Sequence, residues 1–216
     1  MSVLTVDSKK HFYKLALALA AFTIAYNVIE GLVCTLLGFS DESITLFGFG
    51  TDSFIETISG LGIFHMVSRI QAEPKSNRDN YERSALRITG FAFYILVFGL
   101  VLMSVYNIIT GQQPETTFYG VIISVISILV MLILLYYKTK TGKALESEAI
   151  LADAECTRVC IYMSVVLLAS SAMYYFFHFR YTDSIGALLL AYFSFSEGKE
   201  CFEKSRSDKY CSCDHP

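Results

Sequence analysis

Charged residues are scarce in this chain. Asp, Glu, Lys and Arg together make up 17% of its 216 residues, whereas soluble domains carry roughly 25%. Apolar residues account for 54%, and the mean hydropathy is +0.49. A soluble core with this apolar content would need far more polar surface to cover it. The composition therefore argues against a soluble globular domain and favours a membrane protein.

Familiar catalytic and processing motifs are also missing. The apolar segments contain no serine–histidine arrangement, zinc-protease motif or phosphate-binding loop, so we expect neither an enzyme nor a nucleic-acid partner. The first apolar run, Leu15–Leu37, is too long for the core of a cleavable signal peptide and does not end in a small-residue cleavage site. We therefore expect this run to be a membrane span.

Long apolar segments take the place of polar surface. The clearest of them, Phe118–Tyr137, has twenty residues without one charge, and about 20 residues of helix cross the hydrocarbon layer. Six such segments are predicted, at about 14–37, 43–68, 86–110, 117–138, 148–176 and 182–199. The sequence thus predicts an all-α polytopic membrane protein. It has a cytoplasmic N-terminal tail (1–13), a six-helix transmembrane domain (14–199) and a cytoplasmic C-terminal tail (200–216).

Basic residues are distributed very unevenly between the two sides. Fifteen of the 17 Lys and Arg residues fall in or beside the two tails, the link between segments two and three, and the link between segments four and five, predicted at 139–146. Only Arg180 lies on the other side. Because cytoplasmic loops are rich in Lys and Arg, both termini are predicted to be cytoplasmic. We expect a multi-pass protein of the cell membrane.

Acidic residues occur inside the predicted spans. Each acid near the centre of a spanning helix costs about 2.5–3.5 kcal/mol, so these side chains are expected to face one another, water, a bound cation or a proton. Asp52 and Glu56 are four residues apart, and Asp153, Cys156 and Cys160 follow the i, i+3, i+7 spacing, so each set shares one helix face. The acids within the spans are Glu30, Asp52, Glu56, Asp153 and Glu155.

The two faces together form a mixed set of oxygen and sulfur ligands near the middle of the membrane. Thiolates favour zinc and softer ions, whereas carboxylates suit harder ones. Every ligand must lose its proton to bind, so protons compete with the metal. Simpler interpretations remain open. Cys156 and Cys160 are also typical apolar packing residues, and Glu155 is positioned to pair with Arg158 three residues later.

These features resemble the cation diffusion facilitators, also called the cation efflux family, over residues 14–200. Ser43–Glu56 resembles the second helix of the family, Ala149–Cys160 its fifth helix, and Tyr181–Ala187 the start of its sixth. The ligand pairs of the family are typically [HD]-x3-D and form a tetrahedral zinc site that exchanges metal for protons. This chain has Cys156 and Cys160 in place of the second pair. It resembles the minimal branch that lacks the usual C-terminal cytoplasmic domain.

The resemblance implies a homodimeric transporter that exports a divalent cation in exchange for protons by alternating access. Zn²⁺ is the expected ion, with Fe²⁺, Mn²⁺, Cd²⁺ and Co²⁺ as others. The implied ligands are Asp52, Glu56, Cys156 and Cys160, with Asp153 and Glu30 as auxiliary ligands or proton carriers. The alternative is a non-transporting scaffold or modulatory subunit, in which the same residues form a structural polar network. A weaker candidate for metal binding is the C-terminal tract Cys211, Cys213 and His215.

Overall fold

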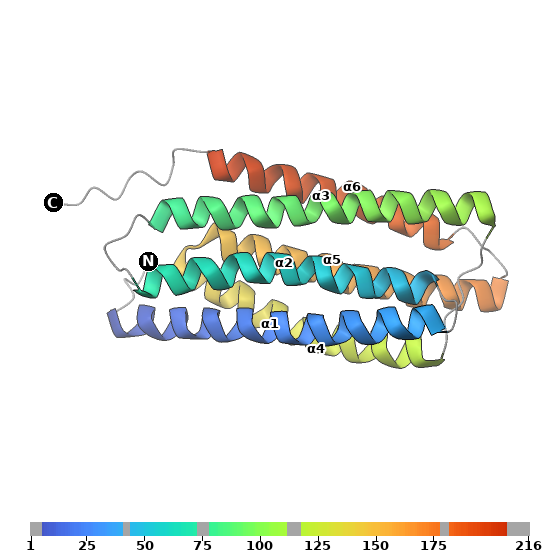
Figure 1. Ribbon diagram of the computed structural model, residues 1–216, viewed down its shortest axis with the longest axis horizontal. Helices are drawn as coiled ribbons and strands as arrows, with labels where there is room; N and C mark the ends of the chain where they lie inside the picture. The colour runs from blue at the N-terminus through green and yellow to red at the C-terminus, as the bar shows by residue number, and fades with distance from the viewer. Residues whose placement is uncertain (1–5, 41–43, 73–77, 112–117, 178–181, 207–216) are drawn as a thin grey trace.

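The computed structural model is a bundle of long helices (Figure 1). It describes residues 6–40, 44–72, 78–111, 118–177 and 182–206, and within these ranges no strand is present. The predicted all-α class is therefore confirmed for this part of the chain, whereas Cys211, Cys213 and His215 lie outside it. The helices are α1 (Val6–Ser40), α2 (Ile44–Ala72), α3 (Arg78–Thr110), α4 (Phe118–Leu145), α5 (Glu148–Phe177) and α6 (Thr182–Arg206).

The connection between α4 and α5 is much shorter than the sequence predicts. The expected polar link at 139–146 is wrong, because α4 continues to Leu145 and α5 begins at Glu148. Glu146 adopts a left-handed φ of 50°, and the Ser147 amide donates to the Gly142 carbonyl at 3.0 Å. Ser147 also caps α5, since its hydroxyl accepts from the Ile150 amide at 3.4 Å. The extra turns of α4 contain lysines, which are good helix formers.

The surface of the bundle is suited to lipid. Among the described residues, three stretches meet the length and hydropathy of a membrane span: Lys9–Leu37, Asn80–Thr110 and Val121–Leu145. Even the shortest helix, α6, has 25 residues, or about 37 Å at 1.5 Å per residue. Large apolar side chains such as Leu36, Ile109 and Leu189 are each more than 65% exposed. Water would make such a surface costly, so the chain is built as an integral membrane protein.

Helix pairing brings distant parts of the sequence together. The most extensive packing joins α1 with α2, α3 with α6 and α4 with α5, and α2 also contacts α5. The start of α1, the α4–α5 turn and the end of α6 all lie at one end of the bundle (Figure 1). The apolar core between the helices includes Met66, Val67, Leu86, Phe93 and Val159, which are all almost fully buried. This packing places the acidic face of α2 against the middle of α5.

The α1–α2 contact depends on glycine. A Cβ atom on Gly50 would lie only 2.6 Å from Thr35 Oγ1 and 2.8 Å from the Thr35 backbone nitrogen. A Cβ on Gly31 of α1 would be 3.1 Å from the Gly50 carbonyl oxygen. Small residues allow helices in membranes to approach at backbone distance. As a result, Glu30, the neighbour of Gly31, is held directly against α2.

Candidate functional site

The two acids of α2 are deeply buried and only partly satisfied. Asp52 is 4% exposed and Glu56 is fully buried. Within the described structure, Asp52 Oδ1 and Glu56 Oε2 have no hydrogen-bond partner. A buried polar atom without a partner costs free energy, and more so when its group is charged. These neighbouring carboxylates therefore present open oxygen atoms to a positively charged ligand.

Lys138, counted among the basic residues in or beside the predicted cytoplasmic link, is in fact part of this site. Lys138 of α4 is 2% exposed. Its Nζ lies 2.8 Å from Asp153 Oδ2 and 3.6 Å from Glu56 Oε1. Burying carboxylates without a compensating charge is costly, which explains why the ammonium turns inward. The number of acids in the spans was the only sequence feature that pointed to a buried base.

Two hydroxyl groups complete the network around Asp153. Thr157 Oγ1 accepts a hydrogen bond from Lys138 Nζ at 2.8 Å and donates one to Glu56 Oε1 at 2.5 Å. Ser59 donates to Asp153 Oδ1 at 2.7 Å. Both oxygens of Asp153 are thus engaged, unlike those of Asp52 and Glu56. We refer to Asp52, Glu56, Lys138, Asp153 and Thr157 as the acid–lysine cluster.

Both predicted thiols lie beside the α2 acids. Cys156 and Cys160 are buried, at 1% and 5% exposure, and neither forms a disulfide. Cys156 directly precedes Thr157, which donates to Glu56, and Cys160 follows one turn later on the same face of α5. In the described part of the chain, however, no three His, Cys, Asp or Glu side chains are arranged to hold one metal ion. The structure brings the predicted residues into one region, and their role as metal ligands stays a prediction.

Glu30 has its own partners. This α1 residue is 6% exposed, and it accepts hydrogen bonds from the Tyr26 hydroxyl at 3.0 Å and the Ser53 hydroxyl at 3.1 Å. Ser53 directly follows Asp52, so Glu30 borders the acid–lysine cluster without entering its hydrogen-bond network. An auxiliary role for Glu30 stays a prediction.

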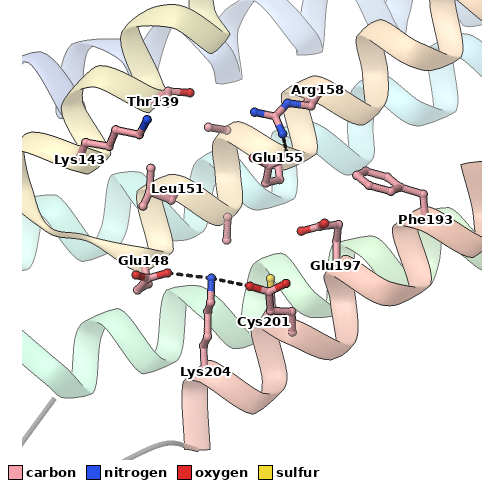
Figure 2. Close-up of a pocket in the computed structure, with 13 residues that line it drawn as sticks. Thr139, Lys143, Glu148, Leu151, Glu155, Arg158, Phe193, Glu197, Cys201 and Lys204 are labelled. Atoms are coloured by element: carbon pink, nitrogen blue, oxygen red, sulfur yellow. Dashed lines mark ion pairs between the residues drawn. The ribbon is translucent and has the colours of Figure 1, made fainter. Parts of the chain in front are cut away.

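A second group of charged residues lines a cavity of about 450 Å³ between α4, α5 and α6 (Figure 2). Glu155 pairs with Arg158 at 2.7 Å, which confirms the predicted structural pairing. Lys204 lies 2.8 Å from both Glu148 and Glu200. Burial lowers the pKa of Lys204, but these two carboxylates outweigh that effect and raise the pKa above its usual range. We call this region the α4–α5–α6 pocket; its charged lining is Lys143, Glu148, Glu155, Arg158, Glu197, Glu200 and Lys204.

The bundle and its buried carboxylates define an integral membrane protein with a polar centre. Residues 16–208 match the model of the cation efflux transmembrane domain. The chain belongs to the cation efflux family, as its α2 and α5 motifs predict. An uncharacterized transporter of Methanocaldococcus jannaschii is 26% identical over 175 residues, which cover 78% of this chain and 61% of that relative. The chain thus spans about three fifths of the length of the curated relative.

Proposed function

We propose that this chain is a secondary transporter that exports a divalent metal cation across the cell membrane in exchange for protons, by alternating access. Membership of the cation efflux family supports cation transport. The observation that carries the proposal is a pair of buried oxygens, Asp52 Oδ1 and Glu56 Oε2, for which the described part of the chain supplies no hydrogen-bond partner. Buried carboxylate oxygens of this kind favour a cation or a proton, because both supply the missing positive charge.

Zn²⁺ is the ion that best suits the surrounding side chains. Cys156 and Cys160 lie beside Asp52 and Glu56, and zinc accepts both sulfur and oxygen ligands in a tetrahedral arrangement. In the proposed bound state these four side chains close around the ion. Asp153 and Glu30 act as auxiliary ligands or proton carriers. Fe²⁺, Mn²⁺, Cd²⁺ and Co²⁺ are the other ions to be compared with zinc.

The proposal includes six membrane spans with both termini in the cytoplasm. The helix lengths support six spans, and the start of α1 and the end of α6 lie at the same end of the bundle (Figure 1). Without the buried Lys138, fourteen of the 17 basic residues remain on the predicted cytoplasmic side. We also propose a homodimer, for which exposed apolar residues of α6, such as Tyr192 at 78% exposure, offer surface.

Transport by purified protein in liposomes tests this function. With a pH gradient and a zinc-sensitive dye inside, the wild type should accumulate Zn²⁺. Asp52→Ala should reduce the flux at least about tenfold, because it removes an open carboxylate from the site. Glu203→Gln is a matched control, since the Glu203 side chain is 66% exposed on α6. Equal flux through wild type and Asp52→Ala would show that the assignment is wrong.

One observation favours the second candidate, a non-transporting scaffold or modulatory subunit. Lys138 already supplies a positive charge to Glu56 and Asp153, as it would in a purely structural polar network. Metal analysis separates the two functions. Protein purified without chelators that contains no stoichiometric metal, and whose melting temperature does not change with added Zn²⁺, would support the structural role.

A further inference from the structure

Lys138 is bound more tightly on one side than on the other. Its Nζ is 2.8 Å from Asp153 Oδ2 and 2.8 Å from Thr157 Oγ1, both on α5, but 3.6 Å from Glu56 Oε1 on α2. Asp153 is itself fixed, because Ser59 donates to its other oxygen at 2.7 Å. The ammonium therefore has a secure position on α5, and Glu56 is its outlying neighbour.

Glu56 faces two possible cations at once. Its Oε1 is near Lys138, while its Oε2 is buried and has no hydrogen-bond partner among the described residues. A second positive charge at Oε2 would stand close to the ammonium, and like charges within about 4–6 Å disfavour each other. The Lys138 ammonium can lose its contact with Glu56 and still retain its contacts with Asp153 and Thr157. The lysine is thus arranged to share Glu56 with an incoming ion.

We propose that Lys138 is a built-in competitor of the transported cation at Glu56, an inference that rests on the transport function proposed above. In the empty site the ammonium compensates Glu56 and Asp153. When a divalent cation binds Asp52 and Glu56, Lys138 withdraws from Glu56 and stays on α5. Its charge keeps the affinity of the site moderate, so that the ion is released at the other side of the membrane. Conduction and transport need binding that is weak enough to reverse.

Calorimetric titration with Zn²⁺ at one fixed pH tests this inference on the purified full chain. Lys138→Met keeps the length of the side chain and removes its charge. It should bind Zn²⁺ at least about tenfold more tightly than the wild type, because a nearby like charge is gone. In liposomes the same variant should show a lower KM and a lower maximal rate, since release becomes slower. This split is not expected of a residue with a merely structural role.

Two further proteins make the measurement specific. Lys140→Met removes an exposed charge from the same helix two residues later and should bind Zn²⁺ like the wild type. The double variant Asp52→Asn/Glu56→Gln keeps the C-terminal tract Cys211, Cys213 and His215. It therefore measures Zn²⁺ binding outside the cluster, which is subtracted from every titration.

If Lys138→Met does not fold, Lys138→Met/Asp153→Asn is compared with Asp153→Asn alone, so that the auxiliary ligand Asp153 is absent from both proteins and they differ only at Lys138. Tighter binding by either folded variant supports the inference. Suppose that the wild type binds Zn²⁺ at the cluster but the folded variant binds it no more tightly than its reference protein. The inference is then wrong, and the proposed transport function is unaffected. A wild type that binds no more Zn²⁺ than Asp52→Asn/Glu56→Gln overturns the proposed function, and the inference with it.

Discussion

The acid–lysine cluster and the α4–α5–α6 pocket contain the same kinds of side chain at the same distances. Lys138 lies 2.8 Å from Asp153, and Lys204 lies 2.8 Å from Glu148. Their surroundings differ, since the side chains are 2% and 2% exposed in the first pair and 36% and 34% exposed in the second. In the pocket, water replaces a lost partner, whereas in the cluster nothing does. Burial, and not distance, decides what each ion pair contributes.

The largest loss of stability is expected when the buried Lys138 is replaced, and a much smaller one when Lys204 is replaced. Lys138→Met leaves Asp153 and Glu56 buried without their base, which should cost about 3–5 kcal/mol of unfolding free energy. Lys204→Met removes two partly exposed pairs, with Glu148 and Glu200, and should cost only about 1 kcal/mol. Denaturant unfolding in detergent without metal gives both values. Similar losses in the two variants would contradict the comparison.

The reactivity of Cys201 tests whether solvent reaches the floor of the α4–α5–α6 pocket. Cys201 lines the pocket yet is 3% exposed, in the predicted C-terminal tail. Burial, aided by the charge of Glu197, raises the pKa of the Cys201 thiol to about 12. The ordinary pKa value for a thiol is 9.0, so at neutral pH Cys201 should react with maleimide roughly a thousandfold more slowly than an exposed thiol.

Peptide mass spectrometry after timed labelling at pH 7, 8 and 9 measures that reaction. The thiolate is the reacting form, so the rate at Cys201 should rise about tenfold for each pH unit without a plateau. The same peptide in denatured protein supplies the ordinary rate. Labelling of the folded protein at that rate at pH 7 would show that the floor of the pocket is open to solvent.

A smaller effect is expected at the hydroxyl that joins Lys138 to Glu56. Thr157→Val removes hydrogen bonds to two buried charged groups and should destabilise the protein by about 1–3 kcal/mol. Ser164→Ala, two turns later on α5, loses only a bond to the Cys160 carbonyl and should cost less than about 1 kcal/mol. Unfolding free energies of the two variants are compared directly. Equal costs would show that Thr157 is an ordinary helix hydroxyl.

The smallest change is expected at Glu155, only two residues from Asp153. Glu155→Gln breaks the partly exposed pair with Arg158 and should cost less than about 0.5 kcal/mol. Zinc flux in liposomes should also be unchanged. Asp153→Asn, measured beside it, should destabilise the protein several times more, because it weakens the contact of a buried lysine. A transport defect in Glu155→Gln would place the pocket on the ion pathway.

Much of this architecture could be predicted because it follows from local spacing. The apolar runs predict the helices, and the four-residue separation of Asp52 and Glu56 places both acids on one face of α2. The stripe of Asp153, Cys156 and Cys160 follows from the same geometry, and the α2–α5 contact brings the two faces together.

Lys138 could not be assigned in this way. A lysine at the end of an apolar run is typical of a cytoplasmic boundary, and only the packing of α4 against α5 turns it inward. The extent of α4 was missed for the same reason, since three lysines suggested a polar link. The metal also stays undetermined, because carboxylates and thiols together accept several ions.

The contact between Gly50 and Thr35 has a mechanical consequence. At the level of Gly31 and Gly50 the two backbones are in close contact, so we expect α1 and α2 to move together as one unit. This unit carries Glu30, Asp52 and Glu56, whereas the α4–α5 hairpin carries Lys138 and Thr157. Any motion that opens the bundle between the two units must part Glu56 from Lys138 and Thr157, so opening the bundle and freeing the carboxylate are a single event.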